Sequence, residues 1–386
     1  MMKKVKTTIY VVLYSFLVCI AMSMGVFAVS MPQIETYTNI FYHTKTPMIG
    51  KTNFQNAYLE FNEEASSIGN PVITEIYFDS YTDADRATYA FARGGGSLVS
   101  TNVLSTIDVS LAQDESIFAH YYTYYNRETS SHIGAMFVLS TETITMPADA
   151  SDFFRETKLY DYDATGAPIS VLTKIEFNNI DTSLVTTINN MFNYCRSLTS
   201  LDLSMFDTPK LTSCYMAFFG CNHLTSLNVS GLKTSLVTDF GYMFTHCSRL
   251  PQLNVSNFNT SSATNMGYMF HNCTSLTSLD LTNFTTNNVT NFRNMFYNCG
   301  KLEMLDLASF NTSSAQNMTQ MFYVARKVTN IYVGTGWNTD NVVESTDMFS
   351  SCISLPNYDP NCVDKTYAYA GIDESTGLYG YLTFKE

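Results

Sequence analysis

Charge is scarce in this sequence. Charged residues make up 14% of its 386 residues, whereas roughly 25% is usual in soluble globular proteins. Ser, Thr, Asn and Tyr supply the polarity instead, which is not typical of a cytosolic enzyme. The formal net charge is −13, and no run of Lys or Arg follows the first six residues. Because a nucleic-acid-binding protein needs a basic surface, we expect no nucleic-acid partner.

Motifs for catalysis and for cofactors are also missing. The sequence has no serine nucleophile elbow, no pair of histidines at helical spacing and no glycine-rich phosphate loop. The glycines at 94–96 are not followed by the Lys-Ser/Thr pair of a phosphate loop. We therefore predict a protein that is not an enzyme and that binds no cofactor.

The first residues predict export from the cell. Lys3, Lys4 and Lys6 precede an apolar run over residues 9–22, and small residues suited to cleavage follow near Ala28. The run is shorter than the roughly 20 residues that span a bilayer. We interpret residues 1–28 as a signal peptide, with an uncleaved anchor as the alternative and the only expected membrane contact. The predicted location is the medium or the cell surface.

Cysteine recurs at a spacing of 26 residues in the second half of the chain. The series runs through Cys195, Cys221, Cys247, Cys273 and Cys299 to Ala325 and, after one inserted residue, to Cys352. A fixed period of this length is the signature of a repeat architecture. It divides residues 172–354 into seven units, which are 172–197, 198–223, 224–249, 250–275, 276–301, 302–327 and 328–354.

Other columns share this period. A Phe stands three residues before each position of the cysteine series, and a Leu or Val stands three residues after the first six positions. One threonine column never varies, and its members are Thr182, Thr208, Thr234, Thr260, Thr286, Thr312 and Thr339. The cysteines themselves are expected to be buried thiols, because Ala325 replaces one without disturbing the period. His223, His246 and His271 fall in three different columns, so we predict no metal site.

The apolar columns also predict the fold. L-x-x-L-x-L is the leucine-rich-repeat pattern, and its L-x-L pair alternates as a short strand with one buried face does. One unit cannot bury its apolar side alone, whereas stacked units share a continuous core. We therefore predict an α/β repeat, a leucine-rich-repeat-type solenoid. Each unit would supply one short parallel strand and a helical or irregular return.

The segments on either side do not follow the period. Residues 32–171 carry seven basic and 18 acidic residues and contain strand-like stretches rich in Tyr and Thr, which predicts an acidic, β-rich N-terminal module or cap. The solenoid is nearly neutral, with nine basic and 11 acidic residues. Alternating aromatics in residues 355–386 predict a C-terminal hairpin that caps the last unit.

The repeat phrase resembles that of the BspA-like leucine-rich-repeat surface proteins, L-x-x-L-D-L-S-x-F-x-T-S-x-V-x-N-M-x-x-M-F-x-x-C. Residues 250–273 and 276–299 match it almost letter for letter. The resemblance implies an exported, non-catalytic adhesin. Its partners would be extracellular or cell-surface proteins, matrix proteins among them. The alternative is a self-associating surface-layer or spacer protein.

Residues that flank the buried strand positions should form outward rows on the parallel sheet. Solenoids commonly bind their partners on such a concave strand face. In the alternative interpretation, these side chains only form hydrogen bonds along the sheet and face solvent. The candidate ligand-binding residues are Asp202, Asn228, Asn254, Asp280, Asp306 and Tyr332.

Overall fold

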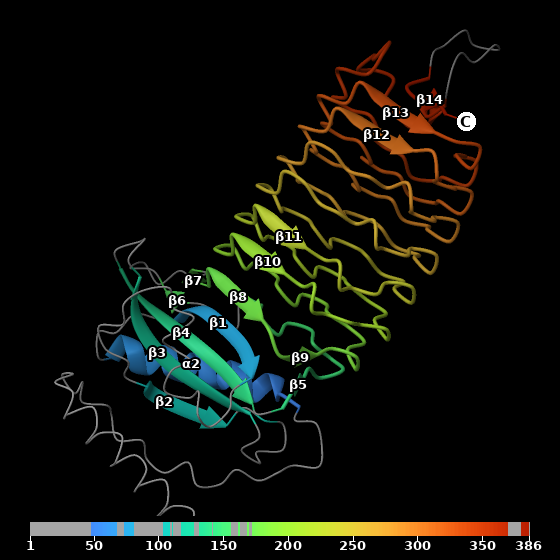
Figure 1. Cartoon of the computed structure of the whole chain (residues 1–386). Coiled ribbons are helices and arrows are strands. Elements are labelled where there is room, and N and C mark those ends of the chain that lie inside the picture. Colours follow the sequence, from blue (N-terminus) through green and yellow to red (C-terminus); the bar gives the residue numbers. More distant parts are fainter. Residues whose placement is uncertain are drawn as a thin grey trace, which may run out of the picture.

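Figure 1 shows a computed structural model of the chain, in which a sheet and a helix lie at one end of a long stack of short segments. The predicted signal peptide, residues 1–28, lies outside the described residues. The structure describes residues 48–67, 73–80, 103–108, 110, 117–126, 131–140, 142–155, 161–162, 168–169, 172–369 and 380–385.

The N-terminal module supplies four strands of a five-stranded mixed sheet of order β2-β3-β4-β1-β8, and the first repeat unit supplies the fifth, β8. β3 (Phe118–Asn126) is antiparallel to β2 (Val103–Asp108) and to β4 (Ser131–Ser140). β1 (Ile73–Ser80) is parallel to β4 and to β8 (Lys174–Phe177). Two further strands, β6 (Asp161–Tyr162) and β7 (Pro168–Ile169), form a separate antiparallel pair.

A helix that the sequence analysis did not predict accompanies the strands of this module. In α2 (Lys51–Ser67), Phe54, Ala57, Tyr58 and Phe61 are all fully buried. Their spacing places them on one face of the helix, which is the pattern of a helix that packs on a core.

The N-terminal module and the first repeat unit share one apolar core. β5 (Ile144–Thr145) pairs in parallel with β9 (Ile180–Asp181) of the first unit. Phe154 stacks on Phe192 with the ring centroids 5.3 Å apart. Segment 144–155 thus occupies the place of a preceding unit. The apolar core is continuous between the predicted N-terminal module and the predicted repeats.

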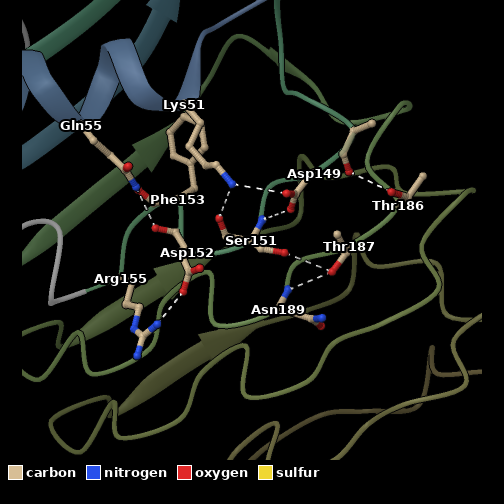
Figure 2. Close-up of polar contacts among 11 residues, drawn as sticks. Lys51, Gln55, Asp149, Ser151, Asp152, Phe153, Arg155, Thr186, Thr187 and Asn189 are labelled. Carbon is tan, nitrogen blue, oxygen red and sulfur yellow. Dashed lines mark hydrogen bonds and ion pairs between the residues drawn. The ribbon is translucent and has the colours of Figure 1, made fainter.

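Polar contacts join helix α2 to the same segment, as Figure 2 shows. The Lys51 ammonium lies 3.5 Å from the Asp149 carboxylate and donates to the Ser151 carbonyl oxygen at 2.9 Å. The Ser151 hydroxyl lies 3.3 Å from the Thr187 hydroxyl in the first unit. The helix, the segment and the repeats are therefore in direct contact.

Consecutive repeat units lie side by side and in parallel. Isolated parallel bridges link Asp149, Thr187, Ser213, Asp239, Asn265, Asn291, Asn317 and Glu344 in one ladder. The prediction of short parallel strands is confirmed by two pairs, β10 (Ser200–Asp202) with β11 (Ser226–Asn228) and β12 (Met304–Leu307) with β13 (Asn330–Val333). Units 250–275 and 276–301, although fully described, carry no assigned strand.

The return of each unit is a series of turns, where the predicted α/β repeat allowed a helix. The N–H of Met243 donates to the Phe240 carbonyl three residues back at 3.2 Å, whereas the N–H of Phe244 donates to the Met269 carbonyl of the next unit at 2.9 Å. This alternation uses left-handed residues, such as His246 with a φ of 61°. Residues 172–354 are all described and contain no α-helix, which corrects the helical option.

Phenylalanine rings in register form the centre of the core. Consecutive ring centroids lie 5.3 to 5.8 Å apart and the ring planes are within 16° of parallel. All of these rings are fully buried. The ladder consists of Phe154, Phe192, Phe218, Phe244, Phe270, Phe296, Phe322 and Phe349.

Each cysteine of the series links its unit to the preceding phenylalanine position. The Cys273 thiol donates to the Phe244 carbonyl at 3.2 Å, and the Cys299 thiol donates to the Phe270 carbonyl at 3.1 Å. The same bond occurs at the other cysteines of the series. Burial raises the pKa of Cys273 to about 12, so that the thiol keeps its proton at neutral pH. The prediction of buried thiols is confirmed.

The invariant threonines join neighbouring units on another side of the core. The Thr286 hydroxyl donates to the Asn311 carbonyl at 2.8 Å and accepts a hydrogen bond from the Asn311 N–H at 2.9 Å. Thr234, Thr260 and Thr312 form the same two bonds with the next unit. Because valine has the same shape but no hydroxyl, it would leave a backbone N–H and a backbone carbonyl of the next unit without these partners.

The C-terminal segment packs on the last repeat unit; the predicted hairpin falls partly outside the described residues and stays a prediction. After a short 3₁₀ helix (Lys365–Tyr367), β14 (Thr383–Phe384) pairs with β13 in parallel. The strand thereby extends an existing parallel edge, whose open peptide groups need partners. The Tyr381 ring stands edge-on to Phe349, with the centroids 5.3 Å apart, and covers the end of the phenylalanine ladder.

Candidate functional site

The strand face is the outward side of residues 199–204 and of the equivalent residues in later units. β10, β11, β12 and β13 follow one another along this side of the stack (Figure 1). Asp202 and Asn228 are neighbours in register, as are Asp306 and Tyr332. Asn254 and Asp280 occupy the same position on the two units between these pairs and are exposed. The structure thus brings the six predicted residues into one row.

Local hydrogen bonds hold the side chains of this row. Oδ1 of Asp202 accepts from the Ser204 N–H at 2.8 Å, and the same turn recurs at Asn228, Asn254, Asp280 and Asp306. At Asp280 the hydroxyl and N–H groups of Thr282 both donate to the carboxylate and lower its pKa below the usual value. One oxygen of each of these side chains therefore stabilises the turn that ends the strand segment. The sequence had predicted hydrogen bonds along the sheet for these side chains, not this bond within the turn.

The C-terminal segment occupies one end of the strand face. The Lys385 ammonium forms an ion pair with Asp306 and lies 5.8 Å from the centroid of the Tyr332 ring. The bond to Asp306 raises the pKa of Lys385 above its usual value. Two of the six predicted residues are thus in contact with the chain's own end. The open part of the row consists of Asp202, Asn228, Asn254 and Asp280.

A band of aromatic side chains lies on the turn side of the stack, and the sequence analysis missed it. Tyr242 stacks on Tyr268 with the centroids 4.2 Å apart, His271 on Tyr297 at 4.5 Å, and Tyr297 on Tyr323 at 4.8 Å. Each ring of the band is at least partly exposed. We name this set the ring band: Tyr194, Tyr215, Phe219, Tyr242, His246, Tyr268, His271, Tyr297 and Tyr323.

Close packing within the ring band alters the ionisation of its members. Burial, followed by the neighbouring Tyr268, raises the pKa of Tyr242 to about 12. Burial lowers the pKa of His271 to about 4, so that this imidazole is neutral at physiological pH. Guanidinium groups lie over two of the rings, Arg196 over Tyr194 at 4.7 Å and Arg293 over Tyr268 at 5.9 Å.

Metal and membrane contacts have no counterpart in the part of the chain that the structure describes. No three His, Cys, Asp or Glu side chains there are grouped so that they could hold a metal ion. No helix among the described residues has the length and apolarity needed to cross a bilayer. The predictions of no metal and no cofactor stay predictions.

The repeats match a protein-family model described as "Mycoplasma protein of unknown function, DUF285". The matches cover residues 167–278, 212–335 and 249–361 and together extend over just over half of the chain. The chain belongs to the DUF285 family. The DUF285 matches coincide with the stacked units. Their overlap agrees with a repeated sequence. No curated protein and no solved structure matches the chain.

Proposed function

We propose that this chain is an exported, non-catalytic surface protein of the BspA-like kind. In this proposal its units form a leucine-rich-repeat-type solenoid. Its strand face binds an extracellular or cell-surface protein, for which a matrix protein is the first candidate. Membership in the DUF285 family supports the repeat architecture, and the match of residues 276–299 to the BspA-like phrase supports the narrower assignment.

The open row on the strand face is the observation that carries this proposal. Asp202, Asn228, Asn254 and Asp280 are all exposed, and each is held by a bond to a backbone N–H two residues later. Side chains that are ordered before binding lose less conformational entropy when a partner docks. A row that repeats once per unit is suited to an extended protein surface.

Capture of partners by the purified chain tests the proposal. We expect the immobilised chain to retain at least one member of a panel of matrix and cell-surface proteins. The variant Ser226→Lys/Ser278→Lys changes two exposed strand-face residues and leaves the turns of Asn228 and Asp280 intact. We expect this variant to lose binding at least tenfold, because two ammonium groups then stand in the contact surface.

The matched control is Ser261→Lys/Ser313→Lys, which adds the same charge to exposed turns away from the strand face. We expect it to bind as the unchanged chain does. Equal binding by both variants would show that the strand face is not the contact surface. Failure to retain any panel member at low and at high salt would contradict the proposed binding function.

A further inference from the structure

Basic residues are absent from six strand segments of the repeats. The six strand segments 199–204, 225–230, 251–256, 277–282, 303–308 and 329–334 contain no Lys or Arg. The acidic residues in these segments are Asp202, Asp280, Glu303 and Asp306. Apart from Lys385 on Asp306, the strand face is therefore acidic among the described residues.

Six of the nine basic residues in the repeats lie at the corner between the ring band and the strand segments or, as Arg293 does, against a ring of the band. Five of them directly follow the cysteine column or stand one residue further on, and Arg293 lies over the ring of Tyr268. Contacts between the corner residues of neighbouring units, such as Ser248 to Asn222 at 3.4 Å and Thr274 to Ser248 at 3.1 Å, align this corner along the stack. We name the exposed set the basic edge: Arg196, Arg249, Arg293, Lys301, Arg326 and Lys327.

The ring band beside this edge has the composition of a protein-contact surface. Tyrosine supplies a large contact area with few rotatable bonds, and stacking such as that of Tyr242 on Tyr268 holds the rings before any partner arrives. In the stacked pairs, such as His271 on Tyr297, the ring faces are turned toward one another, so a partner would meet ring edges there. Such a surface suits side chains of another protein better than the flat stacking of a sugar or a base.

The chain itself carries the complementary surface. Its strand face is acidic and also carries an apolar side chain, Met304, which is 53% exposed. Methionine sulfur packs favourably against ring edges. The strand face and the basic edge belong to the same array, so both follow the same spacing of roughly 4.8 Å per unit. Two arrays lying side by side can therefore keep their units aligned, and opposite charges can meet at the units that carry them.

We propose that the ring band and basic edge of one copy bind the strand face of a second copy. The contact is heterologous, since two different surfaces meet, and it leaves one surface of each kind open at the ends of the assembly. Side-by-side growth of the assembly follows from this geometry. The inference concerns the purified chain alone and does not require the partner protein of the proposed function.

Sedimentation velocity of the full chain tests this contact. We expect concentration-dependent association at about 0.05 M salt and its weakening at about 0.5 M salt, because the charges are exposed and therefore screened. Arg249→Glu/Lys301→Glu should weaken association at least tenfold. The matched control Lys210→Glu/Lys233→Glu makes the same change in net charge at exposed residues outside the basic edge and should associate as the unchanged chain does.

A mixing experiment identifies the two surfaces. Ser226→Lys/Ser278→Lys places two ammonium groups beside Asp202 and Asp280 and offsets their charge on the strand face, and we expect this variant alone to stay monomeric. Mixed with Arg249→Glu/Lys301→Glu, it should form complexes of the two variants. The inference is overturned if the unchanged chain is monomeric at low salt, or if the mixture forms no complex. It is also overturned if Arg249→Glu/Lys301→Glu and Lys210→Glu/Lys233→Glu weaken association equally. Binding to the protein panel is measured separately, so either proposal can fail alone.

Discussion

At the scale of single residues, the repeat depends on polar atoms that lie inside the core or at its edge. The threonine hydroxyls and cysteine thiols each bond to a backbone group of a neighbouring unit. These hydrogen bonds fix the register of one unit on the next, which contacts between apolar side chains alone would not specify. Val324, a β-branched residue with a φ of 61°, shows how strongly the neighbouring units impose the turn conformation.

The variant Thr286→Val tests the contribution of one buried hydroxyl. It keeps the shape of the side chain but leaves the N–H and the carbonyl of Asn311 without these partners. We expect the free energy of unfolding in urea to fall by about 1–3 kcal/mol.

The exposed Thr277 provides the control, because its hydroxyl also donates to a neighbouring unit, at Pro251, but water can replace that bond. Thr277→Val should change the free energy of unfolding by less than about 0.5 kcal/mol. Equal effects of the two substitutions would show that the buried hydroxyl has no special role.

At the scale of elements, the turn that carries Met-Phe-x-x-Cys holds protonated thiols in an apolar environment. Burial raises the pKa of Cys273 from 9.0 to about 12 and raises the pKa of Cys247 and Cys299 as well. The unfolded chain releases these protons near pH 9, whereas the folded chain retains them.

The contribution of these thiols to the free energy of unfolding should therefore be constant below about pH 9 and fall as the pH rises further, by up to about 1.4 kcal/mol per pH unit for each such thiol. Urea titrations at pH 7, 8, 9 and 10 measure this slope. The variant Cys273→Ala, which copies the natural Ala325, should show a smaller slope. A free energy that stays level from pH 9 to 10 would contradict the argument.

The sequence predicts the period and the apolar columns well, because both reflect the direct contact of one unit with the next. It predicts less about the returns, whose alternation of turn bonds and inter-unit bonds depends on left-handed residues as varied as Tyr242, Asn294 and Val324. The helix α2 carried a signal that the β interpretation overlooked, namely Phe54, Tyr58 and Phe61 at helical spacing.

The candidate site was predictable only in part. The strand-face row follows from the alternation of buried and exposed residues, but its covering by Lys385 depends on where the distant C-terminal segment lies. The ring band stayed hidden because its rings come from four positions of the unit, such as those of Phe219 and His246, so no one column contains all of them. An excess of aromatics at positions outside the core columns is the signal that would have found it.

At the scale of the whole molecule, both ends of the phenylalanine ladder are covered by other parts of the chain. Phe154 extends it on the N-terminal side, and Tyr381 stands against Phe349 on the C-terminal side. Because each unit contacts only its neighbours, loss of one cover should destabilise the nearest unit first.

The variant Tyr381→Ala tests this expectation by hydrogen exchange. Amides of residues 328–354 should exchange at least tenfold faster, whereas those of residues 198–249 should keep their rates, since local opening does not require distant units to open. Phe384→Ala is the control, because that ring is 51% exposed. Uniformly faster exchange along the chain would show that the stack opens as a single unit.

The interfaces between successive units are nearly interchangeable, and this affects how the gene can change length. Duplicating or deleting one stretch of 26 codons within the array joins surfaces that already fit. At the new junction the thiol hydrogen bond, the two hydrogen bonds of the threonine hydroxyl and the stacking of the buried phenylalanines would all form again. Misaligned recombination between these similar stretches can therefore lengthen or shorten the repeat array without unfolding it. Related strains are expected to differ in the length of the array by whole units.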